Sequence, residues 1–529
     1  MVLPEEVTGI VRHRGWPKQH EEKKMIHSGA LMPQRGGVSW RDTGETIMTR
    51  MLPVSQEPAL ENIEKLDRMA RRILAEIGIR ILSQPYLDLL AKKKVTIKGD
   101  RVLFFPDQVD GYLALAPACF TLHGIDAAHD VILGDGTSHI TAGYGCASVM
   151  DPDGNIRNAI FQDHVDLVKL VHASDLFHIN GGILAQPSDV APDVSHLAMI
   201  YAALKYSDKC IFGIPGRRQH MEDIMALAAI RTGQGDEFAE TPRILTMISP
   251  VSPLQVDEIG LESLDTAGRY RQPVILSPGV AAGTTGPIDL AGNVALATAE
   301  ALALICMAQA LNPGTPVIFG LQCYGSDMKS GSISIGSPAY AMQARYCAAL
   351  ARYYRLPSRA GGAVNDAKSL SAQAGYESML SMFTALQNRV SLVVHGAGIL
   401  DSFAAVSFEK FIMDLEIIQM VQYYMDDMTV DDSTLDFDLI QSVGPGGLFL
   451  TTMDTMKKCR THAWNPKVAL RGHLMGMSPH EKLFSNIRKA REQLLARYAA
   501  PAIEPEILAA MDAFVRSRGV DPDDLPLYD

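Results

Sequence analysis

After residue 165 the chain repeats one pattern, in which a short apolar segment ends in a small or polar residue and a helical stretch follows. The repeats are spaced roughly thirty to fifty residues apart, as units of one strand and one helix require. Eight segments fit the pattern, and they are FHING near Asn180, CIFG near Gly213, ILTMIS near Ser249, PVILS near Ser277, PVIFG near Gly320, SRAGG near Gly361, SLVVH at His395, and DLIQSVGPGG over residues 438–447.

Strands that alternate with helices form parallel β-α-β units. Eight such units in succession fit a closed (β/α)8 barrel, which typically takes about 250 residues. A doubly wound open sheet is the alternative, but its Gly-rich phosphate fingerprint G-x-G-x-x-G does not follow the first strand. We therefore predict an α/β fold, a (β/α)8 TIM barrel with an N-terminal α+β extension.

The 529 residues are expected to divide into four regions. Apolar positions recur at helical spacing from Pro58 to Gly78, and VTIKGDRVLFFP alternates around a Gly-Asp turn, which predicts a hairpin. The predicted regions are a polar arm over residues 1–50, an α+β region over 51–165, the barrel over 166–475 and a C-terminal helical segment over 476–529.

Charge and cysteine usage limit the function classes. A net charge of −12 argues against nucleic acid as the main partner, because phosphate binding needs a basic surface. The seven cysteines form no C-x-x-C pair, which is typical of a reduced, cytoplasmic protein. Neither C-x-x-C nor H-E-x-x-H occurs, so no tightly bound metal is expected.

No membrane segment is expected either. The first thirty residues have no apolar core of the signal-peptide kind. The longest apolar run, residues 291–314, contains Asn293 and Glu300 and ends at a Pro-Gly turn. We interpret it as a buried helix rather than a membrane span.

The predicted strand SLVVH ends on His395, and Gly396 and Gly398 follow it. Burying an imidazole without a partner is costly, and glycine lets another group come close to the backbone. The ring could simply be satisfied by a backbone carbonyl. In a barrel, however, the active site lies at the carboxyl ends of the strands, which is where this residue falls. We predict that His395 orients substrate or handles a proton.

Other loops after the predicted strands carry polar and aromatic residues with two possible roles each. Asn365, Asp366 and Lys368 either belong to a helix start capped by Ser369 or Ser371, or line the site. Arginines after a Pro-Gly turn are either a solvated pair or a clamp for a carboxylate. Aromatic rings near the strand ends either pack in the core or surround a quaternary ammonium by cation–π attraction. The predicted catalytic residues are His395, Asp366 and Lys368, and the predicted substrate-binding residues are Tyr144, Phe212, Arg217, Arg218, Tyr324, Asn365, Gln373 and Tyr376.

Several longer stretches resemble one family. They are GGAVNDAKSLSAQAGYES, VVHGAGILDSFAAVSFEKFIMDLEII and GSPAYAMQARYCAALARYYRLP, and they are similar to the trimethylamine methyltransferase family, corrinoid-dependent enzymes that include glycine betaine methyltransferases. The similarity extends over nearly the whole chain after about residue 30. It implies a TIM barrel that moves a methyl group from a methylated amine to Co(I) of a corrinoid, which a separate small protein presents at the open end of the barrel.

The resemblance also bears on the substrate. The archaeal trimethylamine enzymes of the family carry pyrrolysine, whereas every position here is a standard residue, as in members associated with glycine betaine, proline betaine or carnitine. A quaternary ammonium already carries its charge and leaves as a neutral amine, so the enzyme mainly positions the methyl group and removes water. Two departures from the family pattern are Ala339, where an acidic residue is expected, and Ile399, where a larger aromatic residue is expected.

We therefore predict a cytoplasmic, corrinoid-dependent methyltransferase that acts on a quaternary methylammonium compound similar to glycine betaine. Its expected partner is a small corrinoid-binding protein that supplies the methyl acceptor, and a homo-oligomer is expected. The alternatives are another barrel enzyme, such as a lyase or demethylase, and a non-catalytic betaine-binding homologue.

Overall fold

Eight parallel strands form the centre of the molecule in the computed structural model, which describes residues 57–474 and 476–525. Their order around the sheet is β6, β18, β17, β14, β13, β11, β10, β9, and a parallel bridge between Thr141 and Ile179 joins the first strand to the last. The strands are β6 (His139–Ile140), β9 (Ile179–Gly181), β10 (Cys210–Phe212), β11 (Ile244–Ile248), β13 (Val274–Leu276), β14 (Val317–Gly320), β17 (Ser358–Gly361) and β18 (Leu392–Val394).

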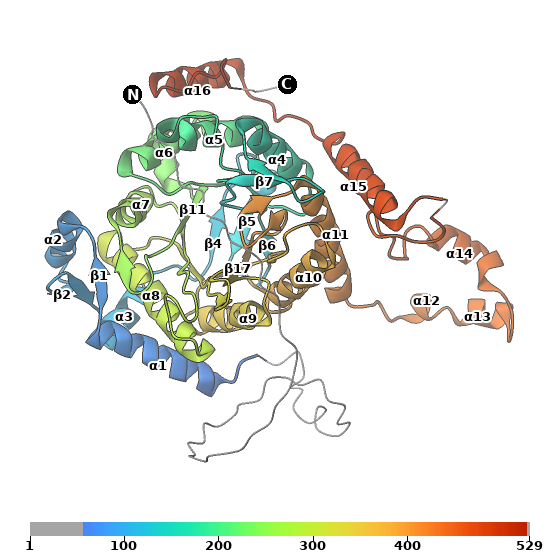
Figure 1. The fold of residues 1–529 in the computed structure, drawn as a ribbon, viewed down its shortest axis with the longest axis horizontal. Helices are drawn as coiled ribbons and strands as arrows, with labels where there is room; N and C mark the ends of the chain where they lie inside the picture. The colour runs from blue at the N-terminus through green and yellow to red at the C-terminus, as the bar shows by residue number, and fades with distance from the viewer. Residues whose placement is uncertain (1–56, 475, 526–529) are drawn as a thin grey trace, which may run out of the picture. The chain divides into compact units, whose positions relative to one another are not determined.

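Each of these strands is followed along the chain by one helix, and the helices surround the strands (Figure 1). The predicted (β/α)8 barrel is confirmed. The helices are α4 (Phe161–Ala173), α5 (Pro192–Tyr206), α6 (Arg218–Thr232), α7 (Glu258–Arg269), α8 (Leu290–Leu311), α9 (Pro338–Tyr353), α10 (Ala372–Gln387) and α11 (Phe408–Met425).

One predicted strand was wrong. Residues 438–447 do not form a strand, because most of that stretch lies in the helix α13 (Phe437–Val443). The eighth strand is β6, which pairs with β18 and belongs to the barrel although it comes before residue 166. The other seven predicted strands are confirmed.

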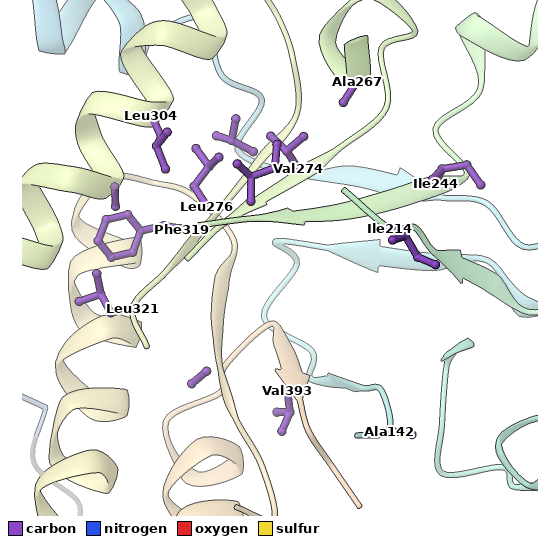
Figure 2. Packing of buried hydrophobic residues seen from close by; sticks show 14 of the residues in the cluster. Ala142, Ile214, Ile244, Ala267, Val274, Leu276, Leu304, Phe319, Leu321 and Val393 are labelled. Carbon is purple, nitrogen blue, oxygen red and sulfur yellow. The ribbon is translucent and has the colours of Figure 1, made fainter. Parts of the chain in front are cut away.

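The strands are mostly apolar on both faces, as in other fully buried parallel sheets. The inner face carries Phe212, Ile275, Ile318 and Leu392, and the hairpin of β4 (Phe120–Leu122) and β5 (Val131–Leu133) adds to the same apolar cluster. The outer face packs on the helices, and Figure 2 shows Leu276 and Phe319 on the side of the sheet that faces Leu304 of α8. Burial of each such side chain stabilises the fold by about 1.5–3 kcal/mol.

The N-terminal extension has the helix predicted between Pro58 and Gly78 and the predicted hairpin. One sheet contains β1 (Ile79–Ile81), β3 (Arg101–Leu103) and β2 (Thr96–Lys98), and β12 (Gln255–Val256) joins it from the barrel region. The pair β4–β5 forms a separate sheet rather than continuing this one. The predicted arm over residues 1–50 lies outside the described residues. The helices of the extension are α1 (Leu60–Glu76), α2 (Gln84–Lys92) and α3 (Pro106–Leu113).

Among the described residues, α8 is the one helix long and apolar enough to cross a membrane, and its apolar window is completely buried in the protein. The expectation of a buried helix at residues 291–314 is therefore confirmed.

Short strands extend the loops at the carboxyl ends of the barrel strands. A four-stranded sheet contains β19, β20, β7 and β8, and a two-stranded sheet contains β15 and β16. The chain beyond α11 is helical, with α15 against α11 and α4, and α16 against α6 and α5. These elements are β7 (Ser148–Met150), β8 (Ile156–Asn158), β15 (Gly325–Ser326), β16 (Ile333–Ser334), β19 (Ile399–Leu400), β20 (Ala405–Val406), α12 (Asp432–Leu435), α14 (Met453–Lys458), α15 (Pro479–Leu495) and α16 (Pro505–Ser517).

Candidate active site

A buried arginine lies inside the barrel near the carboxyl ends of its strands. Arg359 on β17 is opposite Gly320 of β14 and Leu392 of β18 in the sheet. Leu392 belongs to the inner apolar layer, and directly paired residues share a face of the sheet, so the Arg359 side chain points into the barrel. None of this residue is exposed to solvent.

The Arg359 guanidinium has only neutral hydrogen-bond acceptors. Its Nη1 donates to the Ser277 hydroxyl at 3.0 Å and to Gln322 Oε1 at 3.2 Å. Its Nε and Nη2 have no hydrogen-bond partner, and within residues 57–474 and 476–525 no carboxylate forms an ion pair with it. Burial lowers the pKa of Arg359, while the nearby Tyr340 and Tyr324 hydroxyls oppose the shift. A buried cation without an anionic partner is costly, so the guanidinium is a candidate binding group for an anion.

His395 directly follows β18 and has a left-handed backbone, with φ of 61°. Its backbone N–H donates to the Ala142 carbonyl at 3.1 Å, and the Gly396 N–H donates to the Thr141 carbonyl at 2.8 Å. A side chain at Gly396 would bring a Cβ to 2.8 Å from the same Thr141 oxygen, so this position requires glycine. The close crossing of the two loops fixes where the His395 ring lies.

The His395 ring is buried among aromatic rings. Its centroid lies 4.7 Å from that of Phe403 and 6.5 Å from that of Tyr144. Neither ring nitrogen has a hydrogen-bond partner in the described part of the chain. Burial and the charge of Arg359 hold the pKa of His395 well below its ordinary value of 6.5, so the ring is neutral at pH 7.

Two predicted aromatic residues join this group. The Tyr144 ring lies 4.9 Å from the ring of Phe212, which ends β10. The buried Tyr144 hydroxyl has no partner among the described residues, and burial raises its pKa. Tyr324 follows β14 beside Arg359, and burial raises the pKa of its hydroxyl as well. The structure thus gathers Tyr144, Phe212 and His395, and it places Tyr324 near the guanidinium.

Asn365 and Asp366 tie loops together. Asp366 accepts hydrogen bonds from the Ser334 and Ser402 hydroxyls at 3.0 and 2.7 Å, and from the backbone N–H groups of Ile335 and Gly336. The buried Asn365 amide donates to the Ile399 carbonyl at 2.7 Å. Asp366 is saturated by four donors, so its geometry is that of a loop anchor rather than of a free base.

Three other predicted residues lie at the rim. Lys368 is largely exposed and paired with Asp401. Gln373 donates to Glu377 at 2.9 Å within α10, whose N-cap is Ser371. The Tyr376 side chain is exposed, so it forms no part of the buried aromatic group.

The two arginines predicted to hold a carboxylate lie elsewhere. Arg217 is half exposed and paired with Glu258 at 2.7 Å. Arg218 pairs with Asp265 at 3.2 Å and donates to the Tyr86 hydroxyl at 3.1 Å. Carboxylates of the protein already pair with both guanidinium groups, and a substrate carboxylate would have to compete with them.

The predicted site residues did not include Arg359, Gln322 or Ser277. Arg359 did leave a signal, since SRAGG was predicted as a barrel strand and still contains an arginine. A charged residue in the middle of a strand buried on both faces is expensive unless a ligand or partner meets it.

Comparisons with known proteins identify the family of this chain. Residues 34–521 match the family model described as trimethylamine methyltransferase (MTTB). The chain belongs to the trimethylamine methyltransferase family. It is 40% identical over 474 residues to the glycine betaine methyltransferase of Desulfitobacterium hafniense (strain Y51), covering 89% of this chain and 99% of that protein. It is 29% identical over 421 residues to the proline betaine:corrinoid methyltransferase of Eubacterium limosum, covering 77% of this chain and 85% of that protein.

A solved structure, the Methanosarcina barkeri monomethylamine methyltransferase, superposes with a TM-score of 0.46 and 10% identity over 82% of this chain and 93% of that chain. Among residues 57–474 and 476–525 of this family member, no group of three or more His, Cys, Asp or Glu side chains could hold a metal ion.

Proposed function

We propose that this chain transfers a methyl group from a quaternary methylammonium carboxylate, of the glycine betaine kind, to Co(I) of a corrinoid. The observation that carries the proposal is the neutral His395, buried among Tyr144 and Phe403 near the carboxyl ends of the barrel strands. Uncharged and aromatic surfaces suit a cation that brings its own positive charge. The names of the two relatives, which act on glycine betaine and proline betaine, support the same substrate class.

The reaction needs no proton transfer. The C–N bond breaks and its electron pair stays on nitrogen, which leaves as a neutral tertiary amine. The electron pair of Co(I) forms the new Co–C bond. The groups around His395 would therefore hold the ammonium, exclude water and aim one methyl group outward, and this is catalysis by positioning and desolvation.

The acceptor is best supplied by a small corrinoid-binding protein that docks over the carboxyl ends of the strands, where barrel enzymes place their active sites. Co(I) is a strong reductant and survives only in a reducing compartment. All seven cysteines are unpaired, which suits the cytoplasm.

We also propose that the chain pairs with a second copy through its C-terminal region. Residues 420–456 carry fourteen exposed large apolar side chains and seven aspartates but no lysine or arginine. Residues 457–497 carry ten lysines and arginines and only two acidic residues. A two-fold arrangement would place the acidic, apolar part of one copy against the basic part of the other.

The test of the methyl transfer incubates the protein with photochemically or chemically reduced cob(I)alamin and glycine betaine. We expect the Co(I) absorbance to fall as methylcobalamin appears, with one dimethylglycine formed per methyl group. Dimethylglycine formed without cobalamin would indicate a demethylase. Betaine binding by calorimetry without any product would indicate a binding homologue.

A further inference from the structure

The unpartnered nitrogens of Arg359 are adjacent on one edge of its guanidinium. Nη1 is used by Ser277 and Gln322, while Nε and Nη2 have no hydrogen-bond partner among the described residues. The N–H bonds of Nε and Nη2 run parallel, and a carboxylate matches that pair with its two oxygens. Neutral acceptors therefore orient the group and leave its bidentate edge unpaired.

Glycines surround the Arg359 side chain. Gly320 is its neighbour on β14, and a Cβ there would lie 3.3 Å from Arg359 Cδ. Gly361 lies two residues further along β17 on the same face of the sheet, and a Cβ there would collide with the Tyr340 hydroxyl. Larger residues at either position would displace the side chains that face the guanidinium.

Arg359 and the aromatic group are close but distinct. The guanidinium is near enough for its charge to affect the imidazole of His395, whose ring contacts Phe403 and Tyr144. One end of the barrel interior is therefore cationic and the other is neutral and aromatic. A small zwitterion has the opposite arrangement, with a carboxylate one or a few carbons from its ammonium.

We propose that Arg359, held by Ser277 and Gln322, binds the carboxylate of the substrate and so selects zwitterionic over simple quaternary amines. This inference rests on the proposed function for the identity of the other end of the ligand. The anion replaces the missing partner of a buried cation, so its binding there is strongly favoured. The carboxylate end then fixes which methyl group points out of the barrel.

The experiment compares glycine betaine with tetramethylammonium, which has the same cationic centre but no carboxylate. Methyl transfer to cob(I)alamin is measured for the wild type, Arg359→Met and Arg359→Lys. Arg217→Met is the matched control, because it removes a guanidinium that Glu258 already pairs. We expect Arg359→Met to lower kcat/KM for glycine betaine about ten- to hundredfold, the loss of one bidentate charged contact. Transfer from tetramethylammonium should be unchanged or faster, and Arg217→Met should resemble the wild type with both substrates.

Arg359→Lys keeps the positive charge but has no planar pair of N–H donors. Its kcat/KM should therefore fall by an intermediate factor with glycine betaine and stay unchanged with tetramethylammonium. If Arg359→Met does not fold, Gln322→Leu serves instead. We expect it to lower kcat/KM by a smaller factor, and only with glycine betaine. If the Arg359 variants lose kcat/KM equally with both substrates, or lose none with glycine betaine, the inference is wrong.

A binding measurement separates this inference from the proposed function. If the wild type transfers no methyl group from either compound, the proposed function fails. Calorimetry with glycine betaine then decides the role of Arg359, because the wild type should bind it and Arg359→Met should not. Absence of betaine binding to the wild type, or equal binding to both proteins, would contradict the carboxylate site.

Discussion

His395 is the residue whose chemistry is most constrained by its surroundings. Its ring is neutral at pH 7 because burial and Arg359 disfavour the imidazolium form. We therefore expect kcat/KM for betaine to be independent of His395 ionisation between pH 6 and 8. Replacing His395 by alanine should lower methyl transfer by about tenfold or more, because the ammonium loses one wall of its site.

The measurement is the pH profile of methyl transfer for the wild type and His395→Ala, with His480→Ala as the control. His480 is an exposed residue of α15 and should leave the rate unchanged. A titration with a pKa between 6 and 8 that disappears in His395→Ala would show that the ring gains or loses a proton during turnover.

At this scale the sequence already pointed to some residues of the candidate site. His395 was recognisable because a buried strand ended on it, and Tyr144 and Phe212 because aromatic residues flanked strand ends. The ion pairs of Arg217 and Arg218 could not be expected from the sequence. Their partners Glu258 and Asp265 lie more than forty residues away, and an ion pair at that separation leaves no local signal.

The strands show why element prediction succeeded in seven cases and failed in one. Seven strands are short buried segments, most of them apolar, that alternate with helices, and the sequence pattern reveals this alternation. β6 has only two residues, one of them polar, and its position is fixed by pairing with β18 from far along the chain. Residues 438–447 contain apolar residues and end in glycines like a strand, yet residues 438–443 lie in the helix α13.

Helix α11 supports the loop that carries His395. Lys410 and Asp414 form a completely buried ion pair, and Asp414 Oδ2 accepts a hydrogen bond from the Gly398 N–H at 2.9 Å. Lys410 also donates to the Ser378 hydroxyl at 2.9 Å. Burial raises the pKa of Asp414 to about 6 and lowers that of Lys410, although each partner opposes the shift of the other.

We expect Lys410→Met to lower the free energy of unfolding by about 3–5 kcal/mol, because it leaves a buried carboxylate without its cation. The double variant with Asp414→Asn should recover part of that loss, since neither charge then remains. Urea unfolding of the two variants and the wild type measures both values. A double variant no more stable than Lys410→Met would contradict this account, because removing the unpaired carboxylate should relieve its cost.

Buried histidines make the stability of the whole molecule depend on pH. His164 is completely buried between α4 and α5, its Nε2 lies 3.2 Å from the Met199 carbonyl, and burial lowers its pKa to about 4. Burial also lowers the pKa values of His178 and His196 to about 4. Each folded pKa is below the unfolded value of 6.5. The stability from these neutral rings is therefore present above pH 6.5 and is lost as the pH falls toward 4.

We expect the free energy of unfolding to fall steadily from pH 6.5 to pH 4, with His164 alone accounting for about 3 kcal/mol at the acid end. His164→Gln has no titrating group and should flatten this slope, although it is less stable at pH 7. Denaturant titrations at intervals across the range give the slope for each protein. If the free energy of unfolding falls equally with pH in the wild type and in the variant, the pKa of His164 is not lowered by folding.

Residues 420–456 carry fourteen exposed large apolar side chains, and apolar surface left exposed on a monomer promotes aggregation. We therefore expect another molecule to cover this segment permanently. A permanent cover favours a second copy over a corrinoid protein, which must bind and dissociate in each turnover.

We expect the wild type to sediment at twice its chain mass of 57.5 kDa. Replacing Phe437 and Leu450 together by serine should weaken the dimer at least tenfold, whereas Leu60→Ser on α1 should not, although Leu60 is similarly exposed. The acidic residues 420–456 of one copy are predicted to lie against the basic residues 457–497 of the other. Raising the salt concentration should therefore also weaken the dimer of the double variant more than the dimer of the wild type. A wild type that stays monomeric at every concentration would contradict the pairing and would leave the acidic, apolar surface available to the corrinoid protein instead.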